Sequence, residues 1–148
     1  TDFGRGFYTT TSLDQAKWWA NLRAETDSVA SGRSARVSAV LLNFDVDREW
    51  LADREILTFV VATVAFHDFV DACRVGGGTH RRGGGKNAYD IVHGPVRAGG
   101  PKRMIYQNCD QMSFHSQSDC DTLTAHVLDL AANPSDVAAP GLFQIPPP

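Results

Sequence analysis

The sequence is poor in cysteine and has no long hydrophobic run, and each shortage excludes a class of protein. Its 148 residues include three cysteines, Cys73, Cys109 and Cys120, without the spacing of metal ligands. An odd number of cysteines predicts free thiols in a reducing compartment and argues against a disulfide framework or a zinc site. The longest nearly apolar run, from Ile56 to Phe66, is too short to span a bilayer. We therefore expect a cytoplasmic protein that has no metal and no membrane partner.

Positive charge is absent from the last third of the sequence. Residues 104–148 contain five Asp but no Lys or Arg, and residues 1–73 contain 11 Asp or Glu and 7 Lys or Arg. Residues 74–103 carry 7 Lys or Arg and one Asp, although the net charge of the whole chain is −3. This basic block either meets an anionic partner such as a nucleic acid or forms a solvated loop that balances acidic neighbours.

The chain is long enough for one domain with a hydrophobic core. Its patterns predict an α+β domain over residues 1–132 and an extended, Pro-rich tail over residues 133–148. We expect strands at residues 7–11, 36–46, 88–96 and 104–115, and helices at 12–25, within 47–75 and at 118–132. The β-branched part at 56–64 also fits a strand.

The segment from Gly76 to Lys86 is expected to lack regular structure, because six of its eleven residues are glycine. We expect His80, within this segment, to be exposed to solvent. Arg81, Arg82 and Lys86 are the residues through which the basic block is expected to bind an anion.

The start of the chain combines a Gly-x-Gly turn, an aromatic strand and the beginning of a helix. Gly4 and Gly6 allow backbone conformations that are closed to other residues and permit a close approach to a ligand. Ser12 and Gln15 form a capping box, in which the hydroxyl accepts from an amide and Gln15 reaches back. The same local pattern also fits a plain strand with a buried tyrosine at Tyr8, so it identifies no function alone.

Three segments together resemble one known family. They are Asp2 to Thr11 (DFGRGFYTTT), Tyr89 to Val96 (YDIVHGPV, with His93 where the family has Ile) and Asp110 to Ser116 (DQMSFHS). These segments are similar to motifs of uncharacterised bacterial domains in the ADP-ribosyltransferase superfamily, in its branch of diphtheria-toxin-like and poly(ADP-ribose) polymerase-like proteins. The resemblance covers most of residues 2–123 and implies an α+β, ADP-ribosyltransferase-like fold, a split β-sheet core with flanking helices.

The resemblance also implies a function. It predicts an NAD-dependent ADP-ribosyltransferase, a bacterial toxin or effector domain that acts in the cytoplasm or is delivered into the cytoplasm of a target cell. Such an enzyme uses NAD as a substrate, releases nicotinamide and transfers ADP-ribose to a protein, a nucleic acid or a small molecule. NAD glycohydrolase side activity and an antitoxin partner are further expectations of this kind.

The resemblance implies a set of site residues as well. Tyr8 is expected to stack on nicotinamide, and Gln111 stands where the family usually has a catalytic Glu. An amide binds ribose hydroxyls but offers no negative charge to an oxocarbenium-like state, so we expect slow transfer. Asp110 either supplies that charge or is a surface residue of the strand. The residues implied for NAD binding are Gly6, Phe7, Tyr8, Thr10, Ser12 and Trp19.

Two alternatives remain open. The first is an NAD-binding pseudoenzyme or partner-recognition domain. It is favoured by Gln111 and by the absence of the family's first signature, a His-Gly-Ser or His-Gly-Thr strand expected before Asp2. The second is a nucleic-acid-binding module that uses the basic block at residues 74–103.

Overall fold

The structure, a computed structural model, describes residues 1–30, 38–75, 80, 88–100, 102–128 and 138–144, and it confirms the expected α+β class. The segment from Gly76 to Lys86, apart from His80, lies outside the described residues, so the expectation about its order stays a prediction. The described helices are α1 (Leu13–Ala30), α2 (Arg48–Ala52), α3 (Val64–Val75) and α4 (Gln117–Asp121). The described strands are β1 (Phe7–Thr9), β2 (Leu41–Asp45), β3 (Ile56–Thr58), β4 (Ile91–Arg97), β5 (Met104–Phe114), β6 (Thr124–Leu128) and β7 (Leu142–Gln144).

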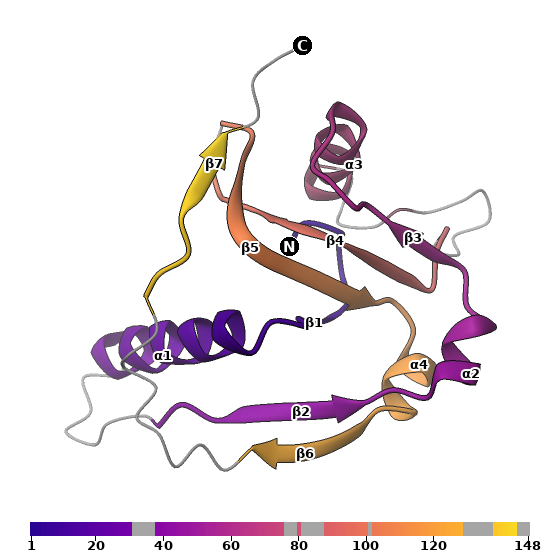
Figure 1. Cartoon of the computed structure of the whole chain (residues 1–148), viewed down its shortest axis with the longest axis horizontal. Coiled ribbons are helices and arrows are strands. Elements are labelled where there is room, and N and C mark those ends of the chain that lie inside the picture. The colour runs from indigo at the N-terminus through magenta and orange to yellow at the C-terminus, as the bar shows by residue number, and fades with distance from the viewer. Residues whose placement is uncertain (31–37, 76–79, 81–87, 101, 129–137, 145–148) are drawn as a thin grey trace.

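Strand β5 organises the larger sheet (Figure 1). Its order is β1-β5-β4-β3, and β7 pairs with β5 as well. The pairing of β3 with β4 is parallel, whereas β5 runs antiparallel to β1, β4 and β7. Strands β2 and β6 form a separate antiparallel pair below this sheet in Figure 1.

The hydrophobic core lies between the larger sheet and α3. Phe66 and Val70, one turn apart on α3, pack with Phe3 and with Val92 of β4, and these four side chains have no exposed surface. Tyr8, Leu57, Phe59, Phe69, Tyr89 and Ile105 pack against this cluster. The apolar side of α3 repeats with helical spacing, as an amphipathic helix over a sheet requires.

The predicted helix at 118–132 is wrong from residue 122 to residue 128, and residues 129–132 lie outside the described part of the chain. Helix α4 ends at Asp121, and Thr124–Leu128 is strand β6, paired with β2 in register from Asp45 opposite Thr124 to Leu41 opposite Leu128. The apolar residues that suggested a helix also fit a strand, and backbone pairing with β2 decides between the two.

Three other expectations are refined. Within residues 47–75 the chain forms α2, β3 and α3, so the strand interpretation holds for Ile56–Thr58. In the expected tail, Leu142–Gln144 is extended and pairs with β5. His80 is not exposed to solvent as expected, because it is half-buried, stacks on Phe69 at 5.8 Å and meets His115 edge-on at 4.2 Å between ring centroids.

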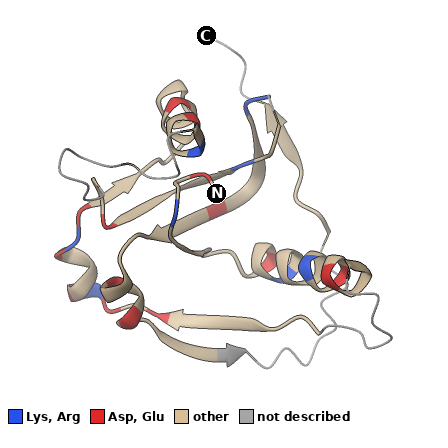
Figure 2. Ribbon diagram, turned by 180° about the vertical axis from the view of Figure 1, so that it is seen from behind, with Lys and Arg blue, Asp and Glu red and all other residues tan. Residues whose placement is uncertain are grey.

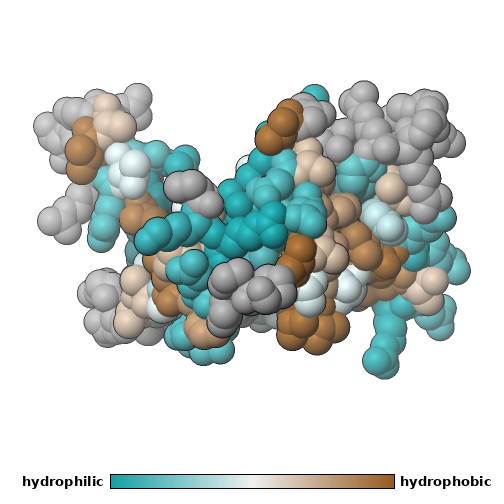
Figure 3. Space-filling model, turned by 90° about the horizontal axis from the view of Figure 1, so that it is seen from above, coloured by the Kyte–Doolittle hydropathy of each residue, from teal (hydrophilic) through white to brown (hydrophobic). Residues whose placement is uncertain are grey.

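The surface is mixed in character. Seen from above, a hydrophilic area lies in the middle of the face, with hydrophobic patches beside it (Figure 3). Exposed apolar side chains include Val60, Val61 and Val64 near the start of α3. Among the described residues no helix has the length and hydrophobicity to cross a membrane.

Candidate functional site

The three matched segments lie on adjacent strands. Residues of the first form β1, those of the second form β4 and those of the third form β5. Ser113 of β5 stands opposite Tyr8 on one side and Val92 on the other. Segments separated by about a hundred residues in the sequence therefore meet at one place in the fold.

Tyr8 and Gln111 share one face of this sheet. Tyr8 is opposite Ser113, which lies two residues from Gln111 on β5, and alternate residues of a strand point to the same face. This face is covered, however. The Phe3 ring stacks on Tyr8 with centroids 6.5 Å apart, and a Cβ added to Gly94, the partner of Gln111, would come 3.4 Å from Phe3.

The Tyr8 hydroxyl anchors the N-terminal turn. It donates to the carbonyl of Gly4 at 2.7 Å and accepts from the backbone N–H of Phe3 at 3.0 Å. Burial raises the pKa of Tyr8, so the phenol stays neutral. Its ring and its hydroxyl both serve the packing of residues 3 to 8.

The Gln111 side chain hydrogen-bonds the buried carboxylate of Asp2. Its Nε2 donates to Asp2 Oδ2 at 2.6 Å and to the carbonyl of Pro95 at 2.8 Å. The same carboxylate accepts from the backbone N–H of Arg97 at 2.7 Å and from the Arg74 guanidinium. The amide predicted to contact ribose is therefore engaged inside the protein.

The other residues expected to bind NAD do not converge with Tyr8. A Cβ added to Gly6 would lie 2.8 Å from the carbonyl oxygen of Phe114, so this glycine permits a close strand contact. Phe7 packs edge-on against Phe44 at 5.3 Å. Trp19 is 53% exposed on α1, does not belong to the core cluster, and contacts the Trp18 ring with centroids 5.6 Å apart.

Thr10 belongs to a polar cluster around Asp110, whose side chain points to the sheet face opposite Gln111. The Asp110 carboxylate accepts from Thr10 Oγ1 at 2.7 Å, from the backbone N–H and hydroxyl of Thr11 at 3.1 and 3.0 Å, and from His93 Nε2 at 3.1 Å. Burial alone would raise the pKa of Asp110, but the bonds from Thr10, His93 and Thr11 hold it below its ordinary value. His93 lies in β4, as the sequence predicted for a sheet residue.

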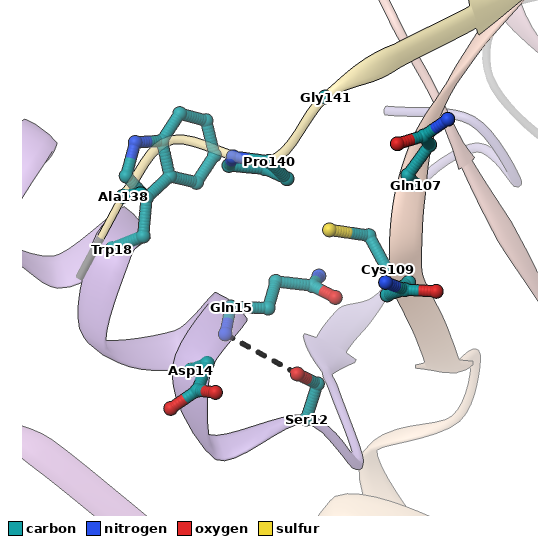
Figure 4. Close-up of a pocket in the computed structure, with 10 residues that line it drawn as sticks. Ser12, Asp14, Gln15, Trp18, Gln107, Cys109, Ala138, Pro140 and Gly141 are labelled. Atoms are coloured by element: carbon teal, nitrogen blue, oxygen red, sulfur yellow. Dashed lines mark hydrogen bonds between the residues drawn. The ribbon is translucent and has the colours of Figure 1, made fainter.

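Ser12 lines a pocket of about 410 Å³ between the start of α1, the bend of β5 and the segment before β7 (Figure 4). Trp18 and Pro140 form one side of it, and the Cys109 side chain points into it from β5. Its volume falls within the range of small-molecule sites, roughly 300–1,000 Å³. Among the described residues that line it, Asp14 is the one with a charged side chain.

The capping box at the start of α1 forms only one of its two expected hydrogen bonds. The Gln15 side chain bonds to β5 beside the pocket instead. The backbone N–H of Gln15 donates to Ser12 Oγ at 3.3 Å, as predicted. The Gln15 amide does not return to Ser12: its Nε2 donates to the carbonyl of Asp110 at 2.8 Å and its Oε1 accepts from the Asp110 N–H at 2.9 Å. The Gln15 side chain therefore hydrogen-bonds the β5 backbone at Asp110, between the part of β5 that pairs with β1 and the part that pairs with β7.

The sequence analysis missed Trp18, Gln15 and Cys109 as pocket residues. Ser12, Gln15 and Trp18 are three residues apart in turn, and this spacing was the available signal for one helix face. Burial and the nearby Asp110 raise the pKa of the Cys109 thiol, which therefore stays protonated.

Ser113 of β5 and His115, just after the end of that strand, form a second polar group. Ser113 Oγ lies 2.7 Å from His115 Nε2, and His115 Nδ1 lies 3.0 Å from the carbonyl oxygen of Arg5. Hydroxyl, base and orienting acceptor are arranged as in a nucleophilic site. Because Ser113 has no exposed surface, this arrangement serves the packing of the strand.

Part of the basic block is neutralised inside the domain. Arg74 pairs with Asp2, Arg97 with Asp71, and Arg103 with Asp68 and Asp71. Along α3, Asp68 and Asp71 precede the basic Arg74 in the last turn (Figure 2). The anion-binding interpretation of the block now depends on Arg81, Arg82 and Lys86, which lie outside the described residues, and on Lys102.

The described residues do not suggest a metal centre, since His, Cys, Asp and Glu form no group of three or more among them that could hold an ion.

Comparison with curated proteins finds no match, and comparison with solved structures finds none either. Residues 1–100 match the family described as "Protein of unknown function (DUF3990)". This match spans β1 to β4 and more than half of the chain, so the chain belongs to that family.

Proposed function

We propose that this domain binds NAD and transfers ADP-ribose slowly, with release of nicotinamide. The observation that carries the proposal is the meeting of the three matched segments on adjacent strands β1, β4 and β5. A chance resemblance of three separate segments would not require them to be neighbours in space. The pocket at Ser12 adjoins two of these segments.

The chemistry of the pocket fits the nicotinamide end of NAD. The nicotinamide ring of NAD is planar and positively charged, and the described lining residues include Trp18, with its indole, and the acidic Asp14, but no Lys or Arg. Ser12 and the exposed edge of the strand at Asn108 and Cys109 offer hydrogen-bonding groups. Since the described lining residues include no Lys or Arg, we place the diphosphate outside this part of the pocket.

This proposal gives the predicted residues different roles. Trp18 and Ser12 contact the nicotinamide end, whereas Tyr8 and Gln111 hold the N-terminal turn on which β1 is built. The Asp110 backbone is bonded to Gln15 at the pocket, but its carboxylate is bonded to Thr10, Thr11 and His93, and Asp110 is not among the described lining residues. Without a Glu at position 111, transfer is expected to be slow.

The adjacent tryptophans provide a matched pair of variants for the test. Trp18→Ala should weaken NAD binding about tenfold, or about 1.4 kcal/mol, because it removes an aromatic wall of the pocket. Trp19→Ala should weaken binding less than Trp18→Ala does, because Trp19 is not among the described lining residues, although its ring contacts that of Trp18 with centroids 5.6 Å apart. Calorimetric titration with NAD measures both affinities, and chromatography of the reaction mixture measures nicotinamide. Equal affinities for the two variants would contradict the placement of NAD in this pocket.

A second candidate is an NAD-binding domain that does no chemistry. It is favoured by the engagement of Gln111 with Asp2 and Pro95, which leaves that amide without a free donor for ribose in the observed arrangement. The two candidates differ in one measurement, because only the transferase releases nicotinamide from bound NAD. The acceptor, whether protein, nucleic acid or small molecule, is then identified by the product that carries ADP-ribose.

A further inference from the structure

The C-terminal part of the chain supplies one wall of the pocket. Ala138, Pro140 and Gly141 line it beside Trp18, while its other described lining residues come from the start of α1 and from β5 (Figure 4). These three residues lead directly into β7 at Leu142. We call residues 138–144 the strap, because they run along the pocket and then pair with the edge of β5. If the strap left β5, the pocket would lose this wall.

Backbone pairing holds the strap in place, whereas its side chains bury little surface. β7 pairs with the first residues of β5, and the N–H of Gln107 donates to the carbonyl of Gly141 at 2.7 Å. All three side chains of β7 are exposed, Leu142 at 49% and Phe143 at 47%. Pro140 is half-buried, and no described residue of the strap belongs to the hydrophobic core cluster. A segment with so little buried apolar surface opens locally at a small cost in free energy.

β1, which pairs with the other end of β5, is held in a different way. Tyr8 packs against the core cluster, and its hydroxyl bonds to Gly4 and Phe3. Leaving β5 would therefore expose core side chains in the case of β1 but not in the case of the strap. A Cβ added to Gly141 would lie 2.7 Å from Gln107 Oε1, so the docked strap lies directly against a side chain of the pocket lining.

We propose that the strap opens and closes over the pocket and that bound NAD holds it closed, and this inference rests on the proposed function. A ligand that contacts Pro140 and Gly141 binds the closed form more tightly than the open form, and it therefore shifts the population towards the closed form. By the same linkage, a change that opens the strap weakens NAD binding in proportion to the fraction of chains that remain closed. Residues of β7 thereby control the affinity of a pocket that they do not line.

Two proline substitutions in β7 make a matched pair of variants. Neighbouring N–H groups of a strand point to opposite sides, and the bond from Gln107 to Gly141 shows which of them face β5. The N–H of Phe143 faces β5, whereas the N–H of Leu142 faces away from it. Phe143→Pro therefore removes a donor from the pairing, and Leu142→Pro does not. Both side chains are about half exposed, and neither residue is among the described lining residues, so an effect on NAD has to pass through the strap.

NAD titration of the parent chain and of both variants is the first test. Phe143→Pro should weaken NAD binding about tenfold or more, because most chains would then have an open strap. Leu142→Pro should keep the dissociation constant within about threefold of the parent value, since the pairing of the strap with β5 survives. Circular dichroism and melting temperatures show whether the rest of each variant stays folded.

Hydrogen exchange of the parent chain is the second test, and it needs no variant. The Gln107 N–H exchanges when the strap opens, because its acceptor belongs to the strap. With NAD at 100 times its dissociation constant, this exchange should slow about 100-fold if the open form does not bind NAD. The control is the Leu51 N–H, which donates to the carbonyl of Asp47 at 3.1 Å in the short helix α2. α2 buries no side chain and lies away from the pocket (Figure 1), so NAD should leave this exchange unchanged.

Each outcome decides the inference. Weaker binding by Phe143→Pro but not by Leu142→Pro, together with slower exchange at Gln107 alone, supports the strap. Parental affinity in a folded Phe143→Pro chain overturns it while NAD binding stands, and so does exchange at Gln107 that NAD leaves unchanged or slows no more than at Leu51. If Phe143→Pro unfolds the domain, the exchange at Gln107 in the parent chain decides. A parent chain that binds no NAD overturns the proposed function, and the inference falls with it.

Discussion

Gln111→Glu should destabilise the domain strongly at neutral pH and weakly in acid. The substitution keeps the side-chain volume, but it replaces the Nε2 donor with a second carboxylate oxygen beside Asp2 Oδ2, where Gln111 now donates at 2.6 Å. The site is 8% exposed, so water cannot screen the two carboxylates fully. The parent amide also donates to Pro95, and that donor is lost as well.

Protonation sets the size of this effect. A protonated glutamate at position 111 can donate to Asp2. The loss in free energy of unfolding at pH 7 that comes from the new charge therefore cannot exceed the free energy needed to protonate this glutamate. With an ordinary Glu pKa of about 4.3, this is about 3.7 kcal/mol at pH 7. The lost bond to Pro95 adds about 1 kcal/mol. The introduced carboxyl has a raised pKa in the folded state, so its penalty is largest at high pH and shrinks as the pH falls towards 4.3.

Urea unfolding at pH 7 and at pH 4.5 measures both values relative to the parent chain. Gln111→Met provides the control, because it removes both donors without adding a charge and should cost about 2–3 kcal/mol at either pH. A Gln111→Glu variant as stable as the parent at pH 7, or one with a penalty independent of pH, would refute the role of Gln111 as the donor to Asp2. The result also governs any attempt to restore a catalytic Glu here, since faster nicotinamide release would be expected only from the fraction that stays folded.

Two further predictions concern stability. Tyr8→Phe removes the hydroxyl that bridges Gly4 and Phe3, and it should lower the free energy of unfolding by about 1–2 kcal/mol; an unchanged melting temperature would show that the hydroxyl is dispensable. Burial and the neighbouring His115 lower the pKa of His80 to about 4, whereas an unfolded histidine binds its proton near pH 6.5. Stability should therefore fall as the pH drops from about 6.5 to about 4, by about 1–3 kcal/mol after allowing for partial exposure, and His80→Gln should flatten this decline in urea titrations at several pH values.

Much of the fold follows from local sequence. The aromatic and β-branched run after Gly6 gives β1, and Ser12 caps α1 through the N–H of Gln15. Strand β5 lies within its predicted range and β4 extends one residue beyond its own, to Arg97, because each is a continuous run with the composition of a strand. Strand β6 was missed because its identity depends on β2, some eighty residues earlier, and the apolar spacing of its own residues fits either structure.

The candidate site was less predictable than the fold, for two physical reasons. No side chain of α1 is buried, so the apolar pattern of that helix does not select a face, and the choice between Trp18 and Trp19 could not be made from it. The role of Gln111 depends on Asp2, 109 residues away, and no local pattern reports such a partner. The pairing of Gln15 with Asp110 is equally remote in sequence, and it is what leaves space for a pocket.

These contacts change the meaning of the N-terminal motif. Its glycines suggest a turn that approaches a ligand. In the structure, Gly4 has a φ of 86° and its carbonyl accepts from the Tyr8 hydroxyl, and Gly6 faces the backbone of β5. The Asp2 carboxylate joins the same turn to β4 and β5, because it accepts hydrogen bonds from the Arg97 N–H and the Gln111 amide. A motif with so many internal partners is required for folding, whether or not NAD binds. Loss of activity on mutating it would therefore say little about catalysis, and the informative substitution is at Trp18, whose side chain lines the pocket.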